Sequence, residues 1–392
     1  MLLSNYTEDL LELEDVIVNK VENINNEKHI YIKMKKRPHI CPSCGIESSN
    51  VHDYRYQIVK DIPILNKFTY IHLQKRRYVC PYCDKRFYES NNFLPKYHRF
   101  TNRLYAFMVS EFHSTHSMKS ISTRCNTSQT TVARIFDNIN HSLTSLPEVL
   151  SIDEFKGNAG GEKFQCILTN PKAKKVLDIL PNRKSEDLYH YFSNFKDRNN
   201  VKYFVTDMNK TYRDLAITCF KNATIIADKY HVVRQVTWAF ENVRKEEQKK
   251  FNTGRRKYFK RSRTLLLKRF DNLTEEQRIQ VENMLSLSER MRNAYMLKER
   301  FYDFMKSPDV YEAKKRLSEW HLLVGVSNLP EFNSCFETFV RWQPFILNAF
   351  TCPYTNGYTE GVNNKIKVLK RNSYGVKNFK RFRNRILYMM SA

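Results

Sequence analysis

Three carboxylates occupy positions at which a charged side chain is unusual. Asp153 lies in VLSIDEF and Asp207 in VKYFVTDM, two apolar runs typical of buried strands, and Glu360 opens a predicted amphipathic basic helix. An uncompensated carboxylate is costly in a buried strand, and divalent metal ions held between such groups would neutralise them. Two such ions can stabilise the attacking and leaving oxygens of a phosphoryl transfer. Each residue alone is more simply explained as a strand-end or surface charge.

Four cysteines form a second group, and their spacing is typical of metal ligands. Cys41 and Cys44 form CPSC, Cys80 and Cys83 form CPYC, and 35 residues separate the two pairs. Each CxxC turn directs two thiolates at one ion, so the two turns supply the four soft ligands of a tetrahedral Zn²⁺ site. The residues between the pairs alternate like strands, which predicts a zinc-ribbon-like hairpin with a closed, structural metal. Redox chemistry is the competing interpretation of a CxxC motif.

Basic residues beside the second cysteine pair indicate a phosphate-binding surface. The predicted DNA-binding residues here are Lys75, Arg76 and Arg77. A solvated rim over a small aromatic core explains the same residues nearly as well.

The segment after the cysteines predicts a helix-turn-helix, because three short amphipathic helices follow one another with a polar break at residues 126–128. Ser128 is a natural N-cap for the third helix. The side chains opposite its apolar stripe would enter the major groove, together with those at its start: Ser128, Gln129, Thr130, Thr131 and Arg134. An ordinary three-helix packing unit is the alternative.

The composition restricts the partner and the compartment. A net charge of +25 in 392 residues favours a polyanion. No apolar run reaches the roughly 18 residues that a membrane span needs, and the acidic N-terminus lacks the basic start of a secretory signal. Nine cysteines, five of them scattered singly, argue for a reducing cytoplasm rather than a disulfide framework. Nucleic acid inside a cell is therefore the predicted partner.

The elements that must position the first two carboxylates begin near residue 148. The sequence predicts three consecutive strands, a helix capped by Ser185, a strand ending at Asp207, a further helix and a fifth strand. This is the order of an RNase H-like fold, in which the first and fourth strands are neighbours. Asp153 and Asp207 would then lie together, and two adjacent carboxylates stay ionised only with a cation between them. We expect Mg²⁺, or Mn²⁺, because it takes hard oxygen ligands.

A long basic helical stretch separates these strands from Glu360. Residues 233–345 show helical spacing with few glycines, which predicts an all-helical insertion in the catalytic domain. Its basic faces could bind DNA, although a run of charge is usually a solvated face. Trp320 and Trp342 could stack on an unpaired base, but core packing is the more frequent role of such a tryptophan.

These motifs together resemble the ISL-three family of insertion-sequence transposases, within the DDE (RNase H-like) superfamily. The resemblance covers nearly the whole chain and rests on CPSC and CPYC, SIDEF, VTDM, IIADKYHVVR and NGYTEGVNNKIKVLKRNSYG, in that order. It implies a catalytic triad of Asp153, Asp207 and Glu360 that binds magnesium. It also implies that Asp228 and His231 form a supporting motif in the core.

The resemblance implies a transposase that binds terminal inverted repeats and catalyses metal-dependent DNA cleavage and strand transfer. Its expected partner is double-stranded DNA, at the element ends and the target, bound by a homo-oligomer in a synaptic complex. Its expected location is the bacterial cytoplasm, at the nucleoid. We predict a multidomain α/β chain with these segments: an N-terminal segment (1–35), a four-cysteine zinc module (36–95), the helix-turn-helix (96–145), the first part of the catalytic core (146–232), the helical insertion (233–345), and the C-terminal part of the core with Glu360 (346–392).

Two other classes of function use parts of the same pattern. A DNA-binding regulator could use the zinc module and the helix-turn-helix without catalysis, and would then be insensitive to Asp207→Asn. An RNase H-like nuclease or resolvase would share the carboxylates and cleave DNA without joining it.

Overall fold

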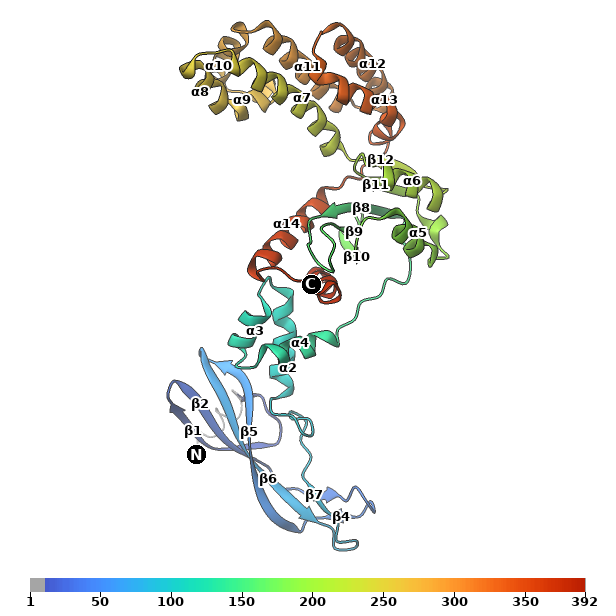
Figure 1. Cartoon of the computed structure of the whole chain (residues 1–392). Coiled ribbons are helices and arrows are strands. Elements are labelled where there is room, and N and C mark those ends of the chain that lie inside the picture. Colours follow the sequence, from blue (N-terminus) through green and yellow to red (C-terminus); the bar gives the residue numbers. More distant parts are fainter. Residues whose placement is uncertain (1–10, 392) are drawn as a thin grey trace. The chain divides into compact units, whose positions relative to one another are not determined.

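Figure 1 shows the computed structural model of the chain, which describes residues 11–391. The first ten residues of the predicted N-terminal segment lie outside the described range. The chain divides into two compact units. Of the described residues, the first unit holds 11–141, 367–376 and 380–391, and the second holds 142–366 and 377–379. Among the described residues, no helix combines the length and the apolar character needed to cross a bilayer.

A five-stranded sheet begins the first unit (Figure 1). Its strands run in the order β1-β2-β6-β5, with β7 beside β6: β1 (Val16–Ile24), β2 (Glu27–Met34), β5 (Val51–Ile64), β6 (Lys67–Val79) and β7 (Arg86–Tyr88). The turns Asn25–Asn26 and Leu65–Asn66 have positive φ at both residues, which suits the twist of two-residue hairpins. The β5–β6 hairpin was expected between the cysteine pairs, whereas the sequence analysis proposed no strands for residues 16–34.

Short helices follow this sheet in the first unit: α2 (Asn102–Ser110), η1 (Glu111–His113), α3 (Met118–Arg124) and α4 (Gln129–Asp137). Thr101, Ser117 and Ser128 each cap a helix by accepting a backbone N–H with the side-chain hydroxyl, so the predicted cap at Ser128 is confirmed. Buried apolar residues from all three α-helices form one core, among them Leu104, Ile121 and Phe136.

The C-terminal helix α15 (Phe379–Met390) contributes to the same core through Tyr388. Its buried Arg385 donates hydrogen bonds to the carbonyls of Phe112, Ser114 and His116, at 2.8 Å and 2.9 Å for the last two. These bonds satisfy carbonyls in the turn between α2 and α3. The predicted C-terminal part of the catalytic core (346–392) is divided in the structure, because residues 367–376 and 380–391 group with the first unit, which holds the helix-turn-helix.

A mixed five-stranded sheet forms the centre of the second unit, in the order β10-β9-β8-β11-β12. Its strands are β8 (Val149–Phe155), β9 (Gln165–Asn170), β10 (Lys175–Leu180), β11 (Tyr203–Thr206) and β12 (Thr224–Ala227). The first three strands are antiparallel, and β11 pairs in parallel with both β8 and β12. The first and fourth strands of this unit are therefore neighbours, as the sequence predicted.

Helices cover one face of this sheet, and their packing forms its main core: α5 (Ser185–Ser193) and α6 (Lys210–Cys219), with the short turn η2 (Arg198–Asn200) between them. The predicted N-cap at Ser185 is wrong by one residue, because Lys184 is the N-cap and its side chain makes no capping bond. Residues around Ala349 and Tyr354 pack against Val149, Val205 and Ile226 on the sheet.

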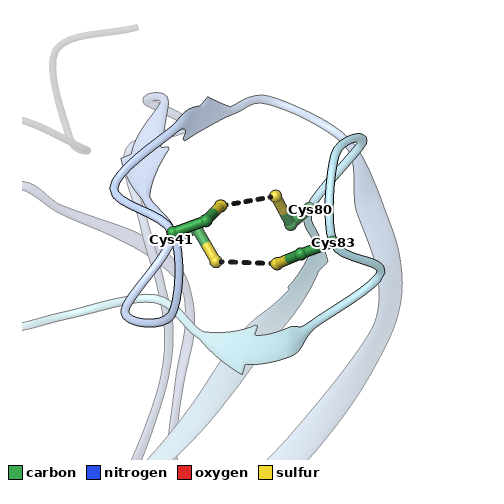
Figure 2. A group of neighbouring side chains, drawn as sticks. Cys41, Cys80 and Cys83 are labelled. Carbon is green, nitrogen blue, oxygen red and sulfur yellow. Dashed lines mark hydrogen bonds between the residues drawn. The ribbon is translucent and has the colours of Figure 1, made fainter.

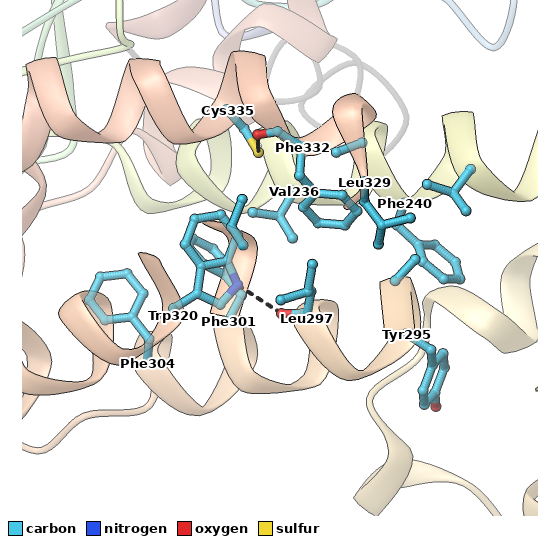
Figure 3. Packing of buried hydrophobic residues seen from close by; sticks show 14 of the residues in the cluster. Val236, Phe240, Tyr295, Leu297, Phe301, Phe304, Trp320, Leu329, Phe332 and Cys335 are labelled. Atoms are coloured by element: carbon cyan, nitrogen blue, oxygen red, sulfur yellow. Dashed lines mark hydrogen bonds between the residues drawn. The ribbon is translucent and has the colours of Figure 1, made fainter. Parts of the chain in front are cut away.

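The residues between β12 and the last part of the second unit are helical, as predicted: α7 (Lys229–Lys249), α8 (Thr253–Arg261), α9 (Arg263–Leu267), η3 (Phe270–Asn272), α10 (Glu275–Ser286), α11 (Glu289–Met305), α12 (Val310–Val326), η4 (Pro330–Phe332) and α13 (Asn333–Asn348). Figure 3 shows their core, in which the Trp320 indole donates to the Leu297 carbonyl at 2.9 Å. Trp320 and Trp342 are both buried, so they are core residues and not exposed stacking platforms. Helix α14 (Gly357–Asn372) follows and carries Glu360.

Candidate active site and DNA-binding modules

Three neighbouring strands of the second unit each deliver an aspartate to the same edge of the sheet. Ile152, Thr206 and Ala227 are aligned across β8, β11 and β12. The next residue in each strand direction is an aspartate: Asp153, Asp207 and Asp228. Because parallel strands present successive residues at matching heights, the alignment places three carboxylates side by side at one level.

Asp153 is buried and is held on both carboxylate oxygens. One oxygen accepts the backbone N–H of Glu154 at 2.7 Å, and the other accepts the amide of Asn363 at 2.9 Å. Burial raises the pKa of Asp153, and the hydrogen bond from Glu154 opposes that effect. The side chain is thus fixed in orientation, and its environment disfavours a negative charge without a compensating cation.

The pKa of Asp207 is strongly affected by its neighbours. Burial and then the charge of Asp153 raise the pKa of Asp207 to about 6. Like charges and low solvent exposure both favour the protonated form of a carboxyl. A cation between Asp153 and Asp207 would reverse both effects, so the pair has the electrostatic character of a cation site.

Glu360 reaches the same region from the first turn of α14. Ligand atoms of Asp228, His231 and Glu360 all lie within 4.8 Å of one another, which makes this trio a candidate metal-binding group. Burial and the nearby charge of Asp228 raise the pKa of Glu360. The electrostatic influence of Asp153 on Glu360 connects the trio with the first aspartates.

Asp228 and His231 form an ion pair at the start of α7, with His231 Nδ1 3.2 Å from an Asp228 oxygen. Burial works against ionisation of Asp228, yet hydrogen bonds from His231 and from the Asn356 backbone N–H lower its pKa below the usual range. The hydrogen bond to Asp228 raises the pKa of His231, and the charge of Asp207 adds to that effect. His231 therefore offsets part of the negative charge of the cluster.

Helix α14 is anchored to the sheet by a row of buried polar side chains that the sequence analysis missed. Asn356, Thr359 and Asn363 are buried on the helix side that carries these contacts. The Asn356 backbone N–H donates to Asp228 at 2.9 Å, and its side-chain oxygen accepts from Ser151. Thr359 lies 2.8 Å from the Thr169 hydroxyl. The i, i+3, i+7 spacing of polar residues across the start of a basic helix was the available signal.

The donor set fits a hard divalent cation. The carboxylates of Asp228 and Glu360 and the imidazole of His231 have ligand atoms within 4.8 Å of one another. The carboxylates of Asp153 and Asp207 come from neighbouring positions of the aligned strands. Such oxygen ligands suit Mg²⁺ or Mn²⁺ better than Zn²⁺, which prefers thiolate and imidazole. The raised pKa values of Asp153, Asp207 and Glu360 are what carboxylates show when their expected counter-charge is a bound ion.

The four paired cysteines form one cluster in the first unit (Figure 2). The sulfur of Cys41 is 3.6 Å from that of Cys83, and the sulfur of Cys44 is 3.5 Å from that of Cys80. Ligands at tetrahedral Zn–S distances would be about 3.8 Å apart, so the cluster matches zinc closely. The N–H of Ser43 points to the Cys41 sulfur at 3.4 Å, as expected for a metal-binding CxxC turn.

The predicted recognition helix is α4 of the first unit. Ser128, Gln129, Thr130 and Arg134 are exposed, and Thr131 is partly exposed. A groove of about 640 Å³ runs beside them and is lined in part by Lys60, Arg99 and Arg134. Two further basic side chains therefore accompany Arg134, which suits a phosphate backbone.

The basic trio on β6, just before Cys80, does not form one surface. Arg76 is buried, paired with Glu89 at 3.0 Å and bonded to the Met34 carbonyl, so we remove it from the predicted DNA-binding set. Lys75 is partly buried and donates to Gln57, and Arg77 is partly exposed near Asp53. A buried arginine in a basic run is indistinguishable from an exposed one until its ion-pair partner is known.

Comparison with known proteins decides the family. A model of a transposase family of the ISL3 group matches residues 150–386, which is more than half of the chain. The chain belongs to the ISL3 family of transposases. Two further matches agree with this transposase assignment: residues 37–83 match the zinc finger of transposases IS204, IS1001, IS1096 and IS1165, and residues 89–140 match the helix-turn-helix domain of ISL3 transposases.

Relatives extend the match along the chain. The transposase for insertion sequence element IS1001 from Bordetella parapertussis is 26% identical over 361 residues, which cover 88% of this ISL3 transposase and 87% of that protein. An ATP-dependent protease of Lactococcus lactis subsp. lactis is 38% identical over 110 residues, or 27% of this chain and 33% of that protein. The second match leaves most of both proteins uncovered and carries no argument about function.

The family assignment confirms the resemblance seen in the sequence. This transposase has a zinc-ribbon module, a helix-turn-helix DNA-binding domain and a transposase domain of mixed helix and strand content. The paired cysteines and the zinc-finger match support a structural Zn²⁺.

Proposed function

We propose that this transposase cleaves and joins DNA by DDE chemistry, with Asp153, Asp207 and Glu360 as its catalytic carboxylates. The observation that carries the proposal is the alignment of β8, β11 and β12, which sets the first two residues beside each other. Helix α14 supplies Glu360 to the same electrostatic cluster. The strand order β10-β9-β8-β11-β12 supports an RNase H-like core.

The three carboxylates would hold Mg²⁺ or Mn²⁺, with Asp228 close to Glu360. Bound divalent ions supply activation of a water or a DNA 3′-hydroxyl and stabilise the leaving oxygen. The Asn363 amide keeps Asp153 in one orientation, and the Asn356 N–H fixes Asp228. His231 lowers the cost of assembling these charges before any metal or phosphate arrives.

The first unit would select the DNA. In this proposal the exposed side chains at the start of α4 read the terminal inverted repeats. Lys75 and Arg77 contact phosphates. The α4 residues are Ser128, Gln129, Thr130, Thr131 and Arg134. The zinc ribbon holds the β5–β6 hairpin in shape. Basic helices of the insertion would bind flanking or target DNA, and a homo-oligomer at the nucleoid would bring two ends together.

A cleavage and joining assay tests the proposal. DNA carrying the element ends is incubated with Mg²⁺ and with wild type, Asp153→Ala, Asp207→Ala or Glu360→Ala, and both nicked and joined products are measured. Each substitution should reduce both products by a factor on the order of 10³ or more, since a metal ligand is lost. Joining by all three variants at the wild-type rate would refute the proposal.

Glu154→Gln is the matched control. Glu154 follows Asp153 on β8, and both its oxygens are bonded to Arg183 at 2.8 Å. Because side chains alternate along a strand, Glu154 points away from the face of Asp153. This variant should keep most of the activity. Nicking without joining by the wild-type protein would instead indicate a nuclease or resolvase.

A further inference from the structure

Helix α7 carries an exposed aromatic and basic stripe directly after Asp228. Tyr230, Arg234 and Trp238 follow one another at intervals of four residues, so they share one side of the helix. All three are exposed. The buried side of the helix holds Val232 and Val236, which pack in the core of the insertion. The stripe therefore faces away from the core.

Trp238 differs from the other two tryptophans of the protein. Half of its surface is exposed (50%), whereas Trp320 and Trp342 are exposed by 1% and 5%. The Arg234 guanidinium lies over the Trp238 ring, 4.3 Å from its centroid. Stacking on a guanidinium holds an aromatic ring in place while leaving the rest of it open to solvent. An exposed, pre-oriented indole of this kind is a typical stacking surface for a nucleobase.

Residues of the stripe lie close to the carboxylate cluster. Tyr230 makes an edge contact with His231, with ring centroids 5.4 Å apart. Arg234 follows His231 by three residues on the same helix, so it lies about one turn from the group of Asp228, His231 and Glu360. A DNA strand whose phosphate lies at the carboxylates would thus meet Arg234 and Trp238 within the next nucleotides along α7.

We propose that Tyr230, Arg234 and Trp238 bind an unpaired nucleotide of the DNA strand next to the cleaved phosphate. Trp238 stacks on the base and Arg234 pairs with the adjacent phosphate. The inference rests on the proposed DDE function of the site. A base offers its face to a side chain only when it leaves the duplex stack, so the occupant is single-stranded or flipped DNA. The positive charge of Arg234 suits DNA better than an apolar protein surface.

Fluorescence of 2-aminopurine tests this inference. End-containing DNA is prepared with 2-aminopurine at each position within a few nucleotides of the cleavage point, and is bound to an Asp207→Asn protein so that it stays uncut. Trp238 should quench the probe at one or two adjacent positions. Trp238→Ala should abolish that quenching and weaken binding of end DNA with unpaired flanking bases about tenfold, since one base stack is lost. Trp238→Phe should keep part of both signals.

Tyr311→Ala is the control, because Tyr311 is a strongly exposed aromatic (79%) on α12 of the same insertion. It should leave quenching unchanged. Quenching that persists in Trp238→Ala would overturn the inference. A loss of self-association in Trp238→Ala without any change in quenching would overturn it too, since the stripe would then be a protein contact.

The two proposals fail separately. Cleavage that survives loss of the carboxylates removes the DDE function, whatever Trp238 does. If Trp238→Ala quenches the probe as wild type does while the carboxylate variants are inactive, only the proposed stacking site is refuted.

Discussion

The amide of Asn363 donates to Asp153 at 2.9 Å across 210 residues of sequence. This bond ties α14 to β8 one helical turn beyond Glu360. The helix that carries one proposed catalytic carboxylate is therefore fixed by contact with another. DNA bound at the cluster would therefore meet Asp153 and Glu360 at positions that are already fixed relative to each other.

Asn363→Ala should slow cleavage about tenfold to a hundredfold, because a hydrogen bond to a charged group contributes about 1.5–3 kcal/mol. The loss should appear in kcat, with little change in the KM for end DNA, because Asn363 orients Asp153 and does not bind the substrate. Single-turnover cleavage measures both parameters. Asn364→Ala, at the exposed neighbouring position, is the control. Equal activity of both variants would show that the bond has no role in positioning.

Asp207→Asn should stabilise the metal-free protein at neutral pH while abolishing cleavage. The pKa of Asp207 in the folded protein is about 6, above the value of about 3.9 in an unfolded chain. Folding is therefore penalised as pH rises from about 4 through 6, when the folded state must lose a proton that the unfolded state has already lost. Without added Mg²⁺, the melting temperature of the variant should exceed that of wild type at pH 7 and approach it near pH 4.

Added Mg²⁺ should narrow the difference at pH 7, because the ion compensates the ionised carboxylate in wild type only. Asp214→Asn provides the comparison, since Asp214 lies on α6 and is paired with Arg213 at 2.7 Å. Because Asp214 lies outside the carboxylate cluster, added Mg²⁺ should change the difference between that variant and wild type little. A gain of equal size at pH 4 and pH 7 would contradict the electrostatic explanation.

Cys83→Ser should remove one bound zinc per chain and weaken binding to end DNA. A structural zinc site contributes on the order of 10 kcal/mol to the folding of a small module, and three ligands hold the ion poorly. Zinc content by mass spectrometry and DNA affinity by fluorescence anisotropy measure the two effects. Cys352→Ser, a partly exposed cysteine outside the cluster, should change neither. Full zinc content in Cys83→Ser would exclude the four-cysteine site.

Arg134→Ala should weaken binding to end DNA by about 1–3 kcal/mol, because Arg134 is an exposed arginine on the predicted recognition helix. The affinity for unrelated DNA should fall less. Arg37→Ala is matched in charge, since Arg37 is exposed and paired with Asp15 at 2.7 Å. Titrations of both variants at several salt concentrations separate specific from electrostatic binding. Identical losses on both DNAs would assign Arg134 to phosphate contact alone.

Because of Lys298, the free energy of unfolding of the helical insertion should increase as the pH rises above about 8. This buried lysine donates to the carbonyls of Leu266 and Lys268 at 2.9 Å and 2.8 Å, and burial lowers its pKa to about 8. Between pH 8 and about 10.4 the unfolded state binds more protons than the folded state, so this group stabilises the fold as pH rises. Urea unfolding of wild type and Lys298→Met should diverge over that range. Parallel pH profiles would contradict the lowered pKa.

The sequence by itself determined the elements whose signals are local. Cysteine spacing predicted the metal cluster, hydroxyl caps and apolar stripes predicted α4, and alternating patterns predicted β8 to β12 in the correct order. These signals survive because hydrogen bonds along a helix and alternation along a strand involve residues only a few positions apart. The aspartates at the ends of β8 and β11 could be paired from strand order alone.

Only the tertiary structure decided which distant groups meet. Arg76 is paired with Glu89 inside the first unit, Asn363 bonds to Asp153, and Asp228 shares its surroundings with Glu360. Burial and partner choice depend on packing between segments up to 273 residues apart, as for Arg385 and Phe112, and no local pattern records them. The sequence therefore determined the kinds of chemistry available to this protein. The fold decided which carboxylates, amides and aromatic rings act together, because hydrogen bonds need contact distances and charge interactions weaken as the charges move apart.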